Sequence, residues 1–76
     1  MKNYYKKPDK EQRMMIDTEN MYVVKLYPGT PLKSITLYYN EETVNGFISD
    51  ASDNTIWEVS TEVDFNNVKN EIISAI

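Results

Sequence analysis

The 76-residue sequence contains no cysteine and no histidine. Without cysteine the chain can form neither a disulfide bond nor a thiolate metal site, and a small chain without disulfides fits a reducing, cytoplasmic compartment. Without histidine it lacks the side chain whose unperturbed pKa lies near neutrality, which is also the usual base for a serine or cysteine nucleophile. We therefore expect no enzymatic activity, no cofactor and no metal site.

Long apolar runs are missing as well. No segment approaches the roughly 18 apolar residues of a membrane helix, and the basic N-terminus, MKNYYKKPDKEQ, is not followed by the apolar stretch of a signal peptide. We expect a cytoplasmic protein without a membrane partner. A hydrophobic content of 41% is enough for one globular fold. Its core is thin, because so short a chain buries only about 60% of the surface that its unfolded form exposes.

Charge is divided unevenly along the chain. Residues 1–13 hold five basic and two acidic side chains, a balance of +3, and residues 14–76 hold three basic and ten acidic ones, a balance of −7, which together give the net charge of −4. Phosphate contacts supply most of the affinity for nucleic acids, so an acidic body argues against binding them. The charge pattern favours a basic protein partner instead, and it allows nucleic-acid contact only through Lys2, Lys6 and Lys7.

The composition predicts two regions. Residues 1–20 are expected to form a basic leader, either partly ordered or folded as a short helix that begins at Pro8. Residues 21–76 are expected to form a single globular domain, in which β-branched and aromatic residues, together with turn formers, indicate strands. The strands are predicted near 21–27, 32–39, 44–49 and 55–60. Apolar residues three and four positions apart then predict a helix near 64–75, with a stripe of Phe65, Val68, Ile72 and Ile76.

Asn45-Gly46 is a dipeptide typical of hairpin turns, so two registers compete for the middle of the chain. In the first register, Asn45-Gly46 is the turn. In the second, residues 40–43 (NEET) form the turn, Tyr39 faces Val44, and the apolar side chains of four strands collect on one face of the sheet. We prefer this second register, which places Gly46 inside a strand. The predicted fold is α+β: a four-stranded antiparallel β-meander with the C-terminal helix packed on its apolar face.

The chosen register brings three aromatic residues together on the opposite face, and tyrosine and tryptophan are enriched at binding hot spots. Acidic residues in the two predicted turns suit a basic partner. The predicted partner-binding residues are Tyr38, Phe47, Trp57, Glu41, Glu42, Asp50 and Asp53. Two interpretations of the aromatic face stay open: it is exposed and binds a partner, or the leader covers it with an apolar lid of Met14, Met15 and Ile16.

The abundance of Asn, Lys, Ile and Tyr is typical of A/T-rich genomes, and small acidic proteins without catalytic groups are often accessory proteins of phages and other mobile elements. By that analogy we expect a protein-binding module that docks on the basic surface of a nucleic-acid-binding partner and inhibits it. The alternatives are a structural homodimer, joined through the mixed sheet face or the Ile76 end, and a nucleic-acid binder that uses the basic leader.

Overall fold

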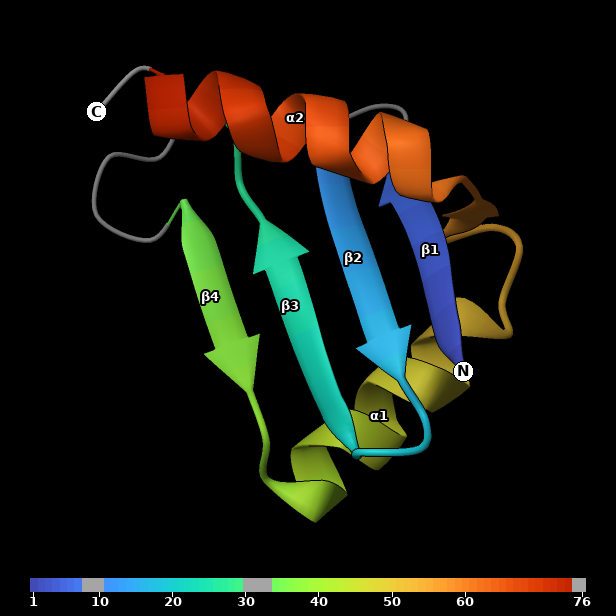
Figure 1. Ribbon diagram of the computed structural model, residues 1–76. Coiled ribbons are helices and arrows are strands. Elements are labelled where there is room, and N and C mark those ends of the chain that lie inside the picture. The colour runs from blue at the N-terminus through green and yellow to red at the C-terminus, as the bar shows by residue number, and fades with distance from the viewer. Residues whose placement is uncertain (8–10, 30–33, 75–76) are drawn as a thin grey trace.

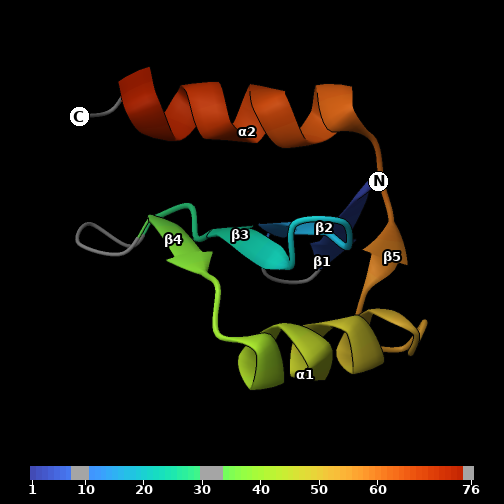
Figure 2. The same ribbon diagram turned by 60° about the horizontal axis from the view of Figure 1, so that its bottom comes forward.

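The computed structural model describes residues 1–7, 11–29 and 34–74. Within these ranges the chain forms one antiparallel sheet, with strand order β4-β3-β2-β1-β5, and two helices. Helix α1 covers one face of the sheet and α2 crosses the other, so the fold is an α+β structure of three layers (Figures 1 and 2). The elements, in chain order, are β1 (Lys2–Lys7), β2 (Gln12–Asp17), β3 (Tyr22–Leu26), β4 (Ile35–Tyr38), α1 (Glu41–Ala51), β5 (Glu58–Val59) and α2 (Glu62–Ser74).

Strand β2 lies at the centre of the sheet and is buried on both faces. Successive side chains of a strand point to opposite faces, so Met14 and Ile16 pack in the core beneath α1, and Met15 packs in the core beneath α2. These three side chains are only 0%, 2% and 7% exposed, in that order. The apolar triplet therefore contributes to two separate cores.

The prediction of a leader over residues 1–20 is wrong for its described part. Residues 2–7 and 12–17 form two strands that pair antiparallel along their whole length, from Lys2 opposite Asp17 to Lys7 opposite Gln12. The charged residues misled the prediction because lysine can lay its apolar stem along a sheet and keep its ammonium group at the surface. Pro8, the proposed start of a leader helix, lies outside the described residues.

Asp17 closes the turn between β2 and β3. Its carboxylate accepts hydrogen bonds from the backbone N–H groups of Glu19, at 3.0 Å, and Asn20, at 2.9 Å, and from the side-chain amide of Asn20, at 3.1 Å. These bonds, those of Asn20 above all, lower the pKa of the Asp17 carboxyl group. The turn thus supplies polar partners for an acid that is 2% exposed.

Strands β3 and β4 form the antiparallel pair that the sequence predicts, and the register differs by two residues. Val24 lies opposite Leu37, whereas the prediction pairs Val24 with Ile35. A shift of two positions keeps every side chain on its expected face, because the side-chain period of a strand is two. Residues 32–33 of the predicted strand lie outside the described residues.

The predicted strand over 44–49, with a turn at 40–43, is wrong: this part of the chain is helix α1. Asn40 is the N-cap, and its side-chain oxygen accepts hydrogen bonds from the N–H groups of Glu42, at 3.1 Å, and Thr43, at 3.2 Å. Asparagine is among the best N-cap residues. The residues that look like a hairpin turn in the sequence therefore begin a helix, and Asn45-Gly46 lies in its interior.

The apolar spacing of α1 explains the error. Val44 and Ala51 are buried against the sheet, and Phe47 and Ile48 pack beside them. Positions 44, 47, 48 and 51 form one face of a helix. Because Val44, Gly46 and Ile48 also recur at every second position, the short segment fits the period of a strand equally well. Only the apolar stripe that includes Ala51 distinguishes the helix from the strand.

The C-terminal part contains a shorter strand than predicted and the expected helix. Only Glu58–Val59 of the predicted strand over 55–60 forms β5, which pairs with β1 at the edge of the sheet. Helix α2 begins after Thr61, whose hydroxyl accepts the N–H of Asp64 at 3.1 Å. Phe65 and Ile72 are buried beneath it, which confirms the C-terminal helix; Ile76 lies outside the described residues.

Substitutions in α1 test the helix directly. Gly46 is exposed, and a Cβ added there meets no atom within 4 Å, so Gly46→Ala should raise the free energy of unfolding by about 0.5–1 kcal/mol. Asn40→Ala should lower it by about 1 kcal/mol through loss of the cap. Asn45→Ala, the same replacement inside the helix, is the matched control. Urea unfolding followed by circular dichroism measures all three, and a loss of stability in Gly46→Ala would contradict the helix.

Candidate partner-binding site

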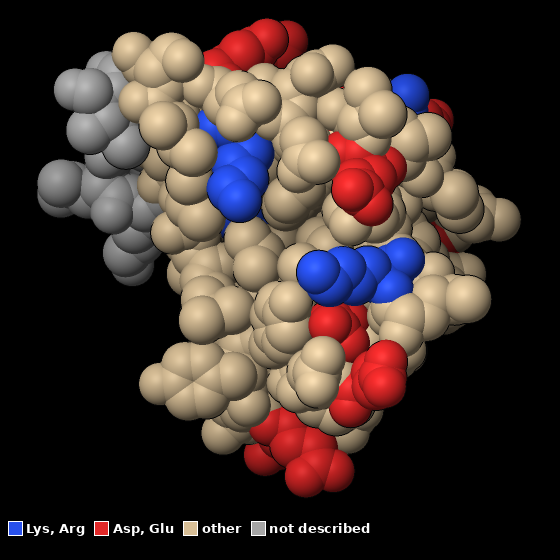
Figure 3. Space-filling view, in the orientation of Figure 1, with Lys and Arg blue, Asp and Glu red and all other residues tan. Residues whose placement is uncertain are grey.

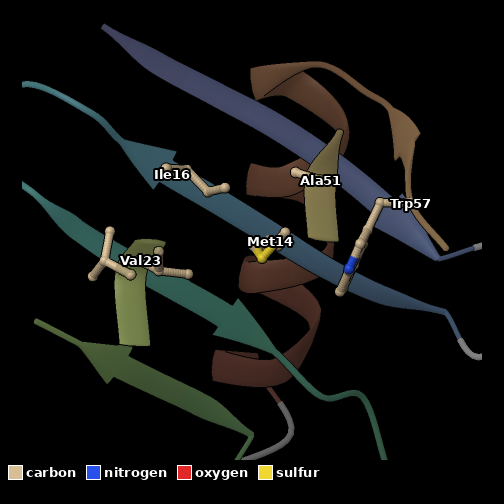
Figure 4. Packing of buried hydrophobic residues seen from close by; sticks show 6 residues of the cluster. Met14, Ile16, Val23, Ala51 and Trp57 are labelled. Atoms are coloured by element: carbon tan, nitrogen blue, oxygen red, sulfur yellow. The ribbon is translucent and has the colours of Figure 1, made fainter. Parts of the chain in front are cut away.

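The three predicted aromatic residues do lie together, in the layer between the sheet and α1. The rings of Tyr38 and Phe47 meet edge to face, with centroids 5.0 Å apart and an interplanar angle of 62°. Trp57 follows α1 in the chain and lies in one core cluster with Met14 and Val23 (Figure 4). The proximity was predicted from strand pairing, and it arises instead from a strand, a helix and the segment that follows the helix.

Trp57 is only 3% exposed, so it belongs to the core and is not a surface contact. Tyr38 and Phe47 are half-buried. Of the two open interpretations, the covered face is the one observed, although the cover is α1 rather than a leader. Met14 and Ile16 do pack in the same cluster as Trp57, and they do so from the central strand β2.

Lys25 of β3 lies among these rings, a feature that the sequence analysis missed. Its Nζ is 4.9 Å from the ring centroid of Phe47, 5.0 Å from that of Tyr27 and 5.3 Å from that of Trp57. Ammonium groups within about 6 Å of a ring centroid are attracted to the ring face. Burial lowers the pKa of Lys25, and the nearby Tyr38 and Asp50 oppose that effect.

The aromatic cluster therefore binds a cation of its own chain. Lys7 of β1 adds a second contact, with its Nζ 5.1 Å from the ring centroid of Trp57. One signal in the sequence could have indicated the arrangement: Val23, Lys25 and Tyr27 share one face of a strand, and that face also holds the aromatic residues. A lysine between two apolar positions of a covered face requires a partner for its charge.

The four predicted acids are exposed and lie at the two ends of α1. Glu41 and Glu42 occupy its first turn, Asp50 its last turn, and Asp53 follows the helix. An 11-residue helix is about 16 Å long, so the acids form two pairs rather than one cluster. The side-chain hydroxyl and the N–H of Thr55 donate to Asp53 at 2.7 and 2.9 Å and lower the pKa of its carboxyl group.

No basic residue lies between Lys33 and Lys69 in the sequence. This stretch includes β4, α1, β5 and the start of α2, and its acids are Glu41, Glu42, Asp50, Asp53, Glu58, Glu62 and Asp64. The last turn of α1 has no basic residue, although a helix C-terminus favours cations. Asp50 at that end opposes the helix dipole, so helix stability does not explain the acid there.

Asp64 is the acid of this stretch that has an ion-pair partner among the described residues. The guanidinium of Arg13 donates through Nε to Asp64 Oδ2 at 2.6 Å, and the Ser60 hydroxyl donates to the same oxygen at 2.9 Å. The hydrogen bond from Arg13 is the main cause that lowers the pKa of the Asp64 carboxyl group. This pair joins β2 to α2, and within the described part of the chain the acids of α1 form no salt bridge.

The basic residues of the predicted leader are part of the sheet. Lys2, Lys6 and Lys7 lie on β1, which is paired with β2 on one side and with β5 on the other. Lys7 contacts Trp57. A free basic arm that binds nucleic acid is therefore not present in residues 1–7.

Other site types receive no support from the described part of the chain. It contains no group of three or more His, Cys, Asp or Glu side chains that could hold a metal ion. Among the same residues, no helix combines the length and apolar character needed to cross a membrane. Comparison of the chain with protein-family models, curated proteins and solved structures finds no match.

Replacing Lys25 tests its half-buried position among the aromatic rings through the pH dependence of the free energy of unfolding. Burial lowers the pKa of Lys25 in the folded chain, so between that pKa and the ordinary lysine value the unfolded chain binds more protons. The contribution of Lys25 to the free energy of unfolding therefore rises with pH across this window. Lys25→Met removes the charge and keeps the apolar stem, so the rise should disappear.

The measurement is urea unfolding of wild type and Lys25→Met from about pH 8 to about pH 11, the range in which lysine titrates. The free energy of unfolding of wild type should therefore rise relative to that of Lys25→Met as pH increases. Lys69→Met, at an exposed position of α2, is the control for the loss of one positive charge. An equal pH trend in both variants would contradict a special environment for Lys25.

Proposed function

We propose that the protein is a non-enzymatic binding module that docks the acidic outer surface of α1 on a basic surface of a partner protein and competes there with nucleic acid as an inhibitor. The observation that carries the proposal is the pair of exposed carboxylate groups at each end of α1, in a stretch of chain without a single lysine or arginine. Glu41, Glu42, Asp50 and Asp53 are the proposed contact residues.

The helix is a rigid support for these charges. It is capped by Asn40 and held on the sheet by Val44, Phe47 and Ala51. Charges that are fixed before binding lose little conformational freedom in a complex. Between the two acidic ends the exposed surface of the helix is neutral and polar, with Asn45, Gly46 and Ser49, so a partner can approach closely along its length.

A basic surface that binds nucleic acid is built to hold a row of negative charges. Two acidic pairs about 16 Å apart on one rigid helix present negative charge over a comparable length. Complementary charge accelerates association and selects the partner. An interaction of this kind weakens with salt, because the Debye length falls from about 10 Å at 0.1 M to about 3 Å at 1 M.

The aromatic residues have a supporting role in this proposal. Trp57 and Phe47 hold α1 against the sheet and surround Lys25. The position of Lys25 beneath the helix also places a positive charge on the inner side of α1, near Asp50. Truncation of Trp57 should therefore reduce the stability of the fold as well as any affinity for a partner.

The test is capture of proteins from the lysate of the producing cells on immobilised chain, with two variants that change the net charge equally. Glu41→Gln/Glu42→Gln/Asp50→Asn neutralises α1. Glu58→Gln/Glu62→Gln/Glu71→Gln neutralises three exposed acids on β5 and α2. Three lost surface contacts at about 0.5–1 kcal/mol each total about 1.5–3 kcal/mol, which corresponds to an affinity loss of about 10- to 150-fold.

We expect one partner that wild type and the β5/α2 variant retain at low salt, that the α1 variant loses, and that high salt or added duplex DNA or RNA releases. Far-UV circular dichroism verifies that both variants are folded. Equal loss in both variants would show that only net charge matters. Capture that is unaffected by salt and by the α1 substitutions would refute the proposal.

A further inference from the structure

Strand β4 is an edge of the sheet, and the direction of its outer backbone groups follows from one hydrogen bond. The N–H of Tyr27 donates to the C=O of Ser34 at 2.8 Å. Hydrogen-bonded and non-hydrogen-bonded pairs alternate along antiparallel strands, and Leu26 lies opposite Ile35 and Val24 opposite Leu37. These two are the non-hydrogen-bonded pairs. Ile35 and Leu37 therefore direct their N–H and C=O groups away from β3.

The side chains of the same two residues are exposed. Ile35 is 41% exposed, Leu37 55% and the following Tyr39 77%. Ile35 and Leu37 belong to the face that α2 crosses, where α2 passes over one end of the strands and leaves the other end of β4 uncovered (Figure 1). In the space-filling view of this face, the lower part of the surface over β4 is uncharged, and charged side chains gather toward β1 and β2 (Figure 3).

The two edges of the sheet differ in protection. Natural proteins protect edge strands by making them short or by placing charges, proline or bulges in them. Strand β5 has two residues and carries Glu58. Strand β4 has the sequence ITLY, with no charge and no proline, and pairs with β3 without a bulge. An edge of this kind is a template for a further strand.

We propose that β4 is a dimerisation edge, at which two copies of the chain pair antiparallel about a two-fold axis beside Leu37. In this register Leu37 lies opposite Leu37 of the second copy, and Ile35 of each copy lies opposite Tyr39 of the other. The outward backbone groups of Leu37 and Ile35 then find their hydrogen-bond partners. All three exposed apolar residues meet in cross-strand pairs, of which aromatic with β-branched is a favourable type.

Charge explains why a second copy fits this edge. Each chain carries a net charge of −4, so the repulsion between two copies is smallest where their acids do not face each other. The paired segment is uncharged. The acids Glu41 and Glu42 follow it in the chain, and an antiparallel arrangement places those of the two copies at opposite ends of the interface. The interface is isologous and closes as a dimer.

The dimer has a consequence for α1. Side chains directly opposite each other in a sheet point to the same face, so the two copies present their α1 helices on one common face of a continuous sheet. The acidic surface of α1 would be doubled there without being covered. Dimerisation does not rest on the proposed function, because sedimentation of the purified chain measures it in the absence of any other molecule.

The first test is sedimentation velocity of the full chain at concentrations up to about 500 µM, which detects interfaces of only a few kcal/mol. Wild type should approach twice the chain mass of 8.9 kDa. Leu37→Lys places two like charges at the axis and should be monomeric. Val63→Lys, at a 69% exposed position of α2, adds the same charge elsewhere and should behave as wild type.

Circular dichroism establishes that the lysine variants are folded. Ile35→Pro gives a second test, because it removes an outward N–H group together with the Ile35 side chain. Ile35→Pro should weaken the dimer at least tenfold. A wild-type chain that is monomeric at about 500 µM overturns the proposal and leaves the edge to a peptide of another protein. Dimers that persist equally in Leu37→Lys and in wild type overturn it as well.

Cysteine substitutions test the register, because the native chain has no thiol. Directly opposite residues of a hydrogen-bonded pair have Cα atoms about 5.5 Å apart, a separation that a disulfide spans. Leu37→Cys should therefore form a covalent dimer under mild oxidation. Ile35→Cys should not, because the two copies of Ile35 are then four positions apart along the strands, about 13 Å. Equal cross-linking of both variants contradicts the register.

Discussion

The burial of strand β2 on both faces is the constraint on which the remaining structure depends. A chain of 76 residues is too short for one thick core, and here it forms two thin cores that share a strand. Met14 and Ile16 supply the core beneath α1, and Met15 supplies the core beneath α2. Strands β1 and β3 satisfy the backbone of β2 on either side, so both helices are positioned by the same six residues.

The features that the sequence predicts are those whose period is unambiguous. The apolar spacing of Phe65, Val68 and Ile72 identifies the C-terminal helix, and β-branched residues identify β3 and β4. The apolar triplet of β2 has no alternation because both faces are buried, and its charged neighbours hide it. Helix α1 is ambiguous because its apolar stripe is short, so tertiary packing and the Asn40 cap decide its structure.

In the candidate site, too, the sequence predicts some features and only the packing decides the others. The strand pairing expected from the sequence brings Tyr38, Phe47 and Trp57 together for the wrong structural reason, because Phe47 lies on a helix. Their role depends on what covers them, and only the packing of α1 and the position of Lys25 decide that. The inner side of α1 is therefore structural. The two surfaces that we propose for partners are the acidic outer surface of α1 and the uncharged edge of the sheet at β4, and they differ in chemistry.

Amide hydrogen exchange, followed residue by residue by NMR, tests the central position of β2 most directly. Amides that exchange only by global unfolding lie in the best protected elements of a fold. We predict the slowest exchange at Met14, Met15 and Ile16 and much faster exchange in the two-residue edge strand β5. Rapid exchange throughout residues 2–17, with β3 and β4 protected, would show that the N-terminal segment is the outer arm its charges suggest.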